Sequence, residues 1–176
     1  MRYVAWRHPS NDAACVCGTA PATRRKGGMS RPRFVGGRNL GDRLTTEPEV
    51  HGLVALMEIQ ASRAAARIGP SGEPVLLLDQ NRARWDPLLI RRGLAALARA
   101  ESLAGALGPY ALQATIASCH APARTAEETD WERIAALYDG LAQISPSPIV
   151  ELNRAVALAM AFGPAAGLEL VDRLMS

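Results

Sequence analysis

Proline and glycine interrupt this sequence repeatedly, and the segments between the interruptions are rich in alanine and leucine. Because Ala and Leu favour helices while Pro and Gly end them, the pattern predicts helices joined by short turns. The run at 75–78 is long enough for a short strand, but it has no evident pairing partner and is interpreted as an extended linker that buries its leucines. The sequence therefore predicts an all-α fold. The interruptions fall at Gly69-Pro70, Gly108-Pro109, Pro122, Pro146 to Pro148 and Gly163-Pro164.

The arrangement of the predicted helices follows from the short connections, which favour antiparallel neighbours. Hydrophobic residues make up 48% of the chain but aromatic residues only 5%, so the core is expected to be aliphatic. From Asp130 onward the helices come as hairpins with tetratricopeptide-like spacing. We therefore predict an array of antiparallel helical hairpins. Leu174 and Met175 lie at apolar positions near the end of the sequence, so we expect the array to be truncated there.

Charge divides the chain into two parts. Residues 1–43 carry nine basic side chains against Asp12 and Asp42, whereas the remainder carries eleven arginines against fifteen acids. Residues 1–38 are also rich in Gly and Pro, so we predict a basic, disordered tail before a helical domain at 39–176. The alternative for the tail is contact with nucleic acid or with an RNA polymerase surface.

Capping residues mark the expected helix starts. Thr46 is predicted to cap a helix that begins near Pro48, and Asp79 to cap a short helix through Trp85. Asp86 before Pro87 gives the same signal again. The sequence from Thr125 to Glu128 matches a capping box for the helix that carries Trp131. The buried face of the first helix is expected at Val50, Leu53, Val54, Leu56, Met57 and Gln60.

Catalytic, cofactor and metal sites have little support in the sequence. No phosphate-binding glycine motif occurs, and Cys15, Cys17 and His8 lack the four ligands at recurring spacing that a structural zinc site needs. Cys119 and His120 are adjacent, so on a helix they point about 100° apart and cannot easily form a catalytic pair. We predict no catalytic residue, no cofactor and no metal. A small helical enzyme would require a cleft that brings His120 close to an acid such as Asp130.

The densest polar run lies between two predicted helices, at residues 79–87. The plainer interpretation is a capped helix with internal ion pairs, anchored to the core by Trp85. The sharper interpretation is a recognition surface for a protein partner, because Arg and Trp are typical of interface hot spots. The candidate residues in this run are Asp79, Gln80, Arg82, Trp85 and Asp86.

Five motifs in order carry a family resemblance. They are EPEVHGLVALM at 47–57, DQNRARWD at 79–86, GPYALQA at 108–114, DW at 130–131 and PSPIVELNRAVA at 146–157. Together they resemble the long, helical, tetratricopeptide-like C-terminal extension of one group of bacterial extracytoplasmic-function sigma factors. The resemblance covers about residues 39–176. The two helical domains that bind promoter DNA and polymerase in that group have no counterpart in this sequence.

The resemblance implies a part in transcription initiation and its regulation. The region is expected to be a regulatory or interaction domain whose partners are RNA polymerase, sigma-factor domains or a regulatory protein, with promoter DNA contacted only through the absent domains. The alternative is a free-standing helical-repeat interaction module. Beyond the polar run, the family-motif candidates are Pro109, Tyr110, Gln113, Asp130, Trp131, Asn153 and Arg154.

The expected compartment is the cytoplasm. Three cysteines form an odd set without a secretory pattern, which is typical of a reducing environment. No apolar run has the length of a signal peptide or of a membrane span, so no membrane association is predicted.

Overall fold

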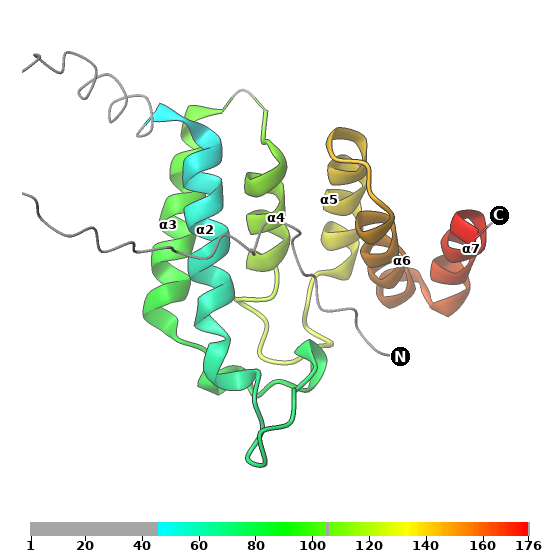
Figure 1. The fold of residues 1–176 in the computed structure, drawn as a ribbon, viewed down its shortest axis with the longest axis horizontal. Helices are drawn as coiled ribbons and strands as arrows, with labels where there is room; N and C mark the ends of the chain where they lie inside the picture. Colours follow the sequence, from blue (N-terminus) through cyan, green and yellow to red (C-terminus); the bar gives the residue numbers. More distant parts are fainter. Residues whose placement is uncertain (1–45, 105, 176) are drawn as a thin grey trace, which may run out of the picture.

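The computed structural model describes residues 46–104 and 106–175 (Figure 1). Within these residues the chain forms α-helices and short 3-10 turns, and no β-strand. The all-α prediction is confirmed for this part of the chain. The predicted disordered tail at 1–38 and the ordered start expected at 39–44 lie outside the described residues. The helices are α2 (Pro48–Ser62), α3 (Pro87–Leu103), α4 (Pro109–Ser118), α5 (Trp131–Ile144), α6 (Pro148–Phe162) and α7 (Pro164–Met175).

From α4 onward the helices are arranged in chain order across the molecule, whereas α2 lies between α3 and α4 (Figure 1). α2, α3 and α4 contact one another, α5 packs on α4, α6 on α5 and α7 on α6 (Figure 1). The long connection between α2 and α3 carries three 3-10 turns, η1 (Ala64–Ala66), η2 (Leu77–Asp79) and η3 (Arg82–Arg84). α4 is therefore the helix that joins the first three-helix group to the last three helices.

Proline at the first helical turn opens α2, α3, α4 and α6, because its fixed φ suits this position and its missing N–H is not needed there. The sequence predicts such starts at Pro48 and Pro87. The predicted cap at Asp86 is confirmed, since its carboxylate accepts hydrogen bonds from the backbone N–H groups of Leu88 (2.8 Å) and Leu89 (3.2 Å). Gly163, with φ 97°, ends α6 before α7 begins.

Three of the predicted caps are wrong. The N-cap of α2 is Glu47 rather than Thr46. Asp79 lies within η2, and Asn81 instead caps η3 by accepting a hydrogen bond from the Ala83 N–H. The capping-box residues at 125–128 form turns before α5, and Asp130 caps α5 by accepting from the Arg133 N–H at 3.0 Å.

The predicted buried face of α2 is wrong at most positions, although Leu56 is partly buried and packs against the cluster of Ala55, Leu97 and Ala114. Leu53 and Met57 are 38% and 62% exposed, and Val54 is exposed too. The buried face comprises Gly52, Ala55, Ile59 and Ser62. Because α2 is apolar around most of its circumference, helical periodicity does not select one face. Small side chains decide instead, since they let neighbouring helices approach closely.

Glycines mark the closest helix approaches. A Cβ built on Gly52 would lie 2.6 Å from the backbone nitrogen of Ala111 on α4. One on Gly93 of α3 would lie 2.6 Å from the Ile59 side chain, and one on Gly167 of α7 would lie 2.5 Å from the Ala155 carbonyl oxygen. The contacts of α2 with α3 and α4, and of α6 with α7, therefore depend on the absence of a side chain.

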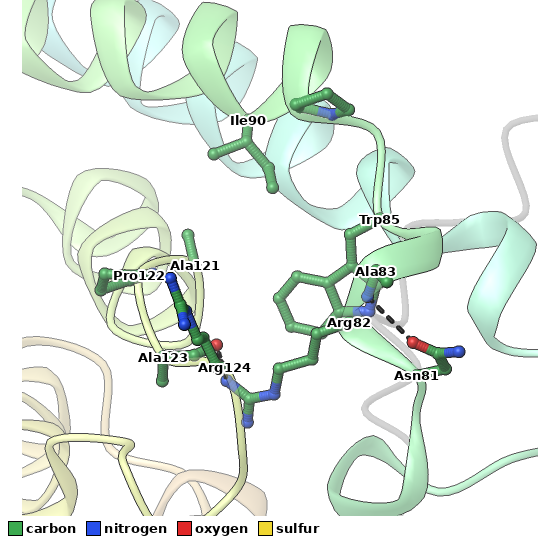
Figure 2. Close-up of a pocket in the computed structure, with 10 residues that line it drawn as sticks. Asn81, Arg82, Ala83, Trp85, Ile90, Ala121, Pro122, Ala123 and Arg124 are labelled. Atoms are coloured by element: carbon green, nitrogen blue, oxygen red, sulfur yellow. Dashed lines mark hydrogen bonds between the residues drawn. The ribbon is translucent and has the colours of Figure 1, made fainter.

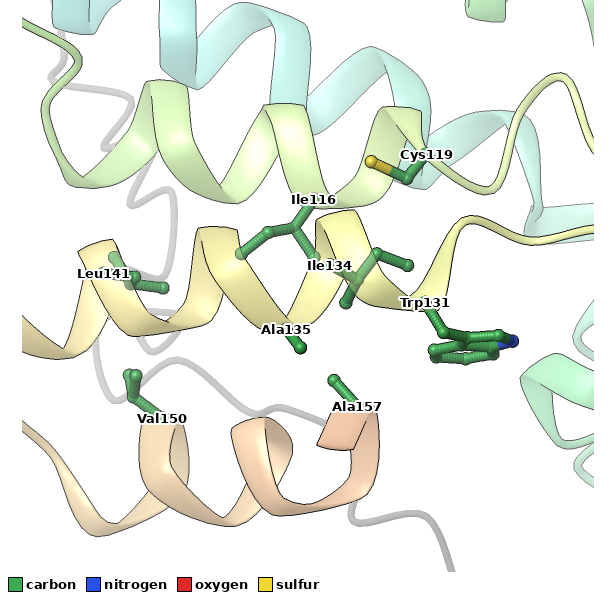
Figure 3. Close-up of a cluster of buried hydrophobic side chains, with 8 residues drawn as sticks. All are labelled: Ile116, Cys119, Trp131, Ile134, Ala135, Leu141, Val150 and Ala157. Atoms are coloured by element: carbon green, nitrogen blue, oxygen red, sulfur yellow. The ribbon is translucent and has the colours of Figure 1, made fainter. Parts of the chain in front are cut away.

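The larger hydrophobic cluster lies between α4, α5 and α6 (Figure 3). α4 faces α5 with Ile116, while Ala135 of α5 and Ala157 of α6 fill the next layer. The predicted linker at 75–78 buries its leucines only in part: Leu78 packs against this cluster, but Leu76 is exposed. The other buried members are Cys119, Trp131, Ile134, Leu141 and Val150.

Candidate functional site

The polar run at 79–87 extends from the last residue of η2 through η3 to the start of α3, beside the loop that joins α4 to α5. Trp85 is only 6% exposed. The backbone N–H of Asp86 donates to the carbonyl oxygen of Ser62 at 2.9 Å, which ties the run to the end of α2. The described ion pairs include none among the charged residues of this run. The predicted internal ion pairs are therefore wrong.

Arg82 instead fastens the run to the loop between α4 and α5. Its Nη1 donates to the carbonyl oxygens of His120 (2.8 Å) and Ala123 (3.0 Å), and its Nη2 donates to the Thr129 hydroxyl at 3.1 Å. Burial lowers the pKa of Arg82, while the charges of Glu127 and Glu128 act in the opposite direction. One guanidinium thus serves three acceptors that lie about forty residues further along the chain, a geometry that suits the planar fork of arginine.

Two guanidinium groups flank Trp85. The Cζ of Arg82 lies 5.2 Å from the indole centroid and that of Arg63 lies 5.6 Å away, both within the range of cation–π attraction. Arg63 is itself buried at the end of α2 and donates to the Gln60 side chain. These contacts help to hold the indole ring in the pocket wall.

His120 lies behind the site, at the end of α4. It is 5% exposed and packs edge-on against Trp131, with ring centroids 5.4 Å apart. Burial, together with the nearby cations Arg63 and Arg82, lowers the pKa of His120 to about 3. Asp130, the acid that an enzyme would have needed beside it, caps α5. His120 is therefore a neutral packing residue at pH 7.

His120 makes stability depend on pH. The pKa of its imidazole is about 3 in the folded chain and about 6.5 in the unfolded chain, so the unfolded state binds more protons between these values. Stability is complete above about pH 6.5 and falls as the pH falls, by about 1 kcal/mol between pH 7 and pH 5.5. Urea denaturation at both pH values measures this change. His120→Gln, which does not titrate, should reduce the difference, and an ordinary His120 pKa by NMR would contradict the expectation.

A pocket of about 460 Å³ opens between η3 and the α4–α5 loop (Figure 2). Trp85 and Arg82 form one side, and the loop from Ala121 to Arg124 forms the other, with Ile90 of α3 above them. Its volume falls in the range of ligand pockets. The full lining is Asn81, Arg82, Ala83, Trp85, Pro87, Ile90, Ala121, Pro122, Ala123 and Arg124. We take this pocket as the candidate functional site.

The candidate residues of the polar run have different roles at the pocket. Arg82 and Trp85 line it, and Asp86 caps α3 beside it. Asp79 is exposed within η2, and the Gln80 amide donates to the Val75 carbonyl oxygen at 3.3 Å.

The remaining candidates lie elsewhere in the fold. Trp131 is buried and donates from Nε1 to the Ala126 carbonyl oxygen at 3.1 Å, so it supports the loop from behind. Gln113 is half-buried on α4, and Pro109 and Tyr110 begin that helix at the end away from His120. On α6, Asn153 is buried, and Arg154 pairs with Asp139 at 2.5 Å and with Glu151 at 3.3 Å.

Glu49 lies in the first turn of α2 and also serves the N-terminus of a second helix. Its carboxylate reaches from α2 to the start of α4, where it accepts from the N–H groups of Tyr110 (2.8 Å) and Ala111 (3.1 Å). A Cβ at Gly108 would lie 2.4 Å from the Glu49 carboxyl carbon, which explains a glycine there. Arg63 and Thr129 were missed because only tertiary contacts reveal their roles.

Replacing Glu49 with glutamine should lower the free energy of unfolding by about 1.5 kcal/mol. The amide keeps one acceptor oxygen for Tyr110 or Ala111 but loses the second acceptor and the negative charge at the start of α4. Chemical denaturation measures the change. Glu101→Gln, an exposed change on α3, serves as the control and should have almost no effect. Equal effects of the two substitutions would contradict the cap.

Residues 46–104 and 106–175 contain no group of three His, Cys, Asp or Glu side chains placed to hold a metal ion. In the same part of the chain, no helix combines the length and the apolar character that crossing a membrane requires.

Comparison with known proteins gives a family match and a relative, neither with an assigned role. Residues 37–101 match a family described as "Family of unknown function (DUF6596)". An uncharacterized protein of Rhizobium meliloti (strain 1021) is 47% identical over 128 residues, which is 73% of this chain and 30% of the relative. The chain thus spans about a third of the length of that relative. No solved structure gives a significant match.

Proposed function

We propose that the helical region is a regulatory protein-interaction domain of the sigma-factor type, which acts on transcription initiation through RNA polymerase or sigma-factor domains in the cytoplasm. The observation that supports the proposal is that the DQNRARWD motif forms much of the pocket wall. Four of its residues, Asn81, Arg82, Ala83 and Trp85, line the pocket. The motif that contributes to the family resemblance is thus also the one that builds the candidate site.

The arrangement of the helices supports an interaction domain. α6 packs on α5 and α7 packs on α6, where Gly167 lies close to Ala155, and we propose that these helices form tetratricopeptide-like hairpins. Arrays of this kind bind peptides or proteins in surfaces between their helices. The proposal assigns the domain no enzymatic activity.

The first experiment uses the longer Rhizobium relative, of which this chain matches 30%. The remainder of that protein, expressed without the matching part, is mixed with core RNA polymerase and, separately, with this chain. We expect it to co-elute with core polymerase in gel filtration and to bind the chain in calorimetry. Failure to associate with core polymerase would overturn the sigma-factor assignment, and an unrelated partner recovered by this chain would favour a free-standing interaction module.

The second experiment concerns DNA. If promoter contacts belong to domains that this sequence does not contain, the 176-residue chain alone should give no sequence-selective shift in a mobility assay at physiological salt. A pool of random duplexes, sequenced before and after selection on the chain, measures this directly. Enrichment of a defined sequence would contradict the proposal.

A further inference from the structure

We propose that the pocket beside Trp85 binds a short peptide segment in which a carboxylate stands next to an apolar side chain. This inference rests on the proposed function and deepens it, because it names the chemistry of the segment that the interaction domain recognises. The proposal follows from the charge, the shape and the attachment of the pocket walls.

The charges on the pocket lining are all positive. Arg82 and Arg124 are the ionisable residues among the ten that line it. Because Arg82 is partly desolvated, which lowers its pKa, an arriving carboxylate would restore some of the electrostatic stabilisation that burial removes. Charge complementarity therefore favours an anionic ligand.

Acidic side chains near the pocket are engaged or lie outside the lining. Glu128 accepts a hydrogen bond from the backbone N–H of Arg124 at 2.7 Å, and Asp86 caps α3. Glu127 is exposed, and its pKa is lowered by a hydrogen bond to its backbone and another from the Thr125 side chain. Glu127 and Glu128 act electrostatically on Arg82, but neither lines the pocket, so Arg82 and Arg124 are the charged side chains that an entering carboxylate meets.

The remaining walls are apolar. Trp85, Pro87 and Ile90 form one side and Ala121 with Pro122 forms the other, as Figure 2 shows for the labelled residues. A pocket of about 460 Å³ with these walls accepts an aliphatic or aromatic side chain beside the carboxylate. The combination of apolar walls and two arginines matches a mixed acidic and apolar segment better than a purely polar anion.

The pocket walls are held together before any ligand arrives. Arg82 bonds to the carbonyl oxygens of His120 and Ala123 in the opposite wall, and the Asp86 N–H bonds to Ser62 at the end of α2. A preformed pocket loses little conformational entropy on binding, which favours even a short ligand.

Two other occupants fit the charges less well. Residues 1–43 hold nine basic side chains against two acids, so this segment carries the same sign of charge as the pocket. Nucleic acid would meet Glu127, Glu128, Asp130 and Glu132, which are exposed on the loop and at the start of α5. An acidic peptide has neither disadvantage, because a short segment can avoid the flanking acids.

The test uses the full ¹⁵N-labelled chain and the peptide acetyl-Gly-Asp-Leu-Asp-Leu-Gly-amide. We expect NMR shifts in the backbone N–H signals of residues 81–85, 90, 121, 123 and 124 and in the Trp85 indole N–H. The same peptide with Asn in place of Asp should bind about tenfold more weakly, and one with Lys should not bind. Equal binding of the Asp and Asn peptides, or no shifts at these positions, would overturn the proposal.

Matched variants locate the contact. Arg124→Glu should weaken the Asp peptide about tenfold, whereas Arg99→Glu, the same charge change on an exposed part of α3, should change it less than twofold. Ala83→Phe fills the pocket from an exposed position and should abolish binding while circular dichroism shows a folded chain. Pocket shifts that depend on protein concentration without peptide would identify a second copy as the occupant and overturn the proposal.

The outcomes separate this inference from the proposed function. If the remainder of the Rhizobium relative binds core polymerase and this chain, but the acidic peptide does not bind, only the peptide chemistry fails. If the peptide binds in the pocket but the remainder of the Rhizobium relative does not bind core polymerase, only the sigma-factor assignment fails.

Discussion

Replacing Arg82 with alanine is expected to lower the free energy of unfolding by about 3 kcal/mol. The substitution removes three hydrogen bonds and one of the two guanidinium groups that flank Trp85. It also leaves the partly buried carbonyl oxygens of His120 and Ala123 without their donor. Urea denaturation measures the stability, and amide hydrogen exchange should show faster opening at residues 119–130.

Two variants make this expectation specific. Arg82→Lys keeps the charge but not the planar fork, so it should recover less than half of the loss. Arg84→Ala removes an exposed arginine from the same turn and should change stability by less than about 0.5 kcal/mol. Similar small effects of Arg82→Ala and Arg84→Ala would show that the hydrogen bonds of Arg82 contribute little to the fold.

Replacing Gly52 with alanine should destabilise the fold by about 2 kcal/mol, although alanine is the better helix former. The new Cβ would lie 2.6 Å from the backbone nitrogen and 2.9 Å from the Cα of Ala111. Because these atoms belong to the α4 backbone, the helices have to move apart, at a cost of about 3 kcal/mol. The gain of about 1 kcal/mol in helix propensity offsets only part of this.

Gly140 provides the matched control for Gly52. It also lies within a helix, α5, but a Cβ built on it meets no atom within 4 Å. Gly140→Ala should therefore raise the free energy of unfolding by about 1 kcal/mol. Denaturation of both variants under one set of conditions measures the change in the free energy of unfolding for each. Stabilisation by Gly52→Ala would show that α2 and α4 are less closely packed than the distances to Ala111 indicate.

Helix positions could be predicted from the sequence because their signals are local. Pro87 after Asp86, Pro148 after Ser147, and Gly163 act within one turn of the residue itself. Faces could not be predicted in the same way. In α2, Ala55 is buried and Leu53 is exposed. The reason is that α4 packs closely on the face that carries Gly52 and Ala55, where only short side chains fit.

The candidate site could be predicted only in part, because it too depends on contacts between residues that are far apart in the sequence. Arg82 and Trp85 stand out in the sequence as an unusual polar and aromatic pair. Their partners do not, because the acceptors of Arg82 lie 38 to 47 residues away along the chain. No local pattern points from Arg82 to Thr129, and the pairing of Glu49 with the start of α4 spans an even longer separation.

The two charged residues that hold α4 bear on how the chain folds during synthesis. Ten residues are too few for a stable isolated helix, but Glu49 neutralises the N–H groups at one end of α4 and Arg82 binds the His120 carbonyl just beyond the other. Both precede α4 in the sequence and therefore leave the ribosome before it. α4 can thus be capped at both ends as soon as it emerges, and it then offers a finished surface to α5 while translation continues.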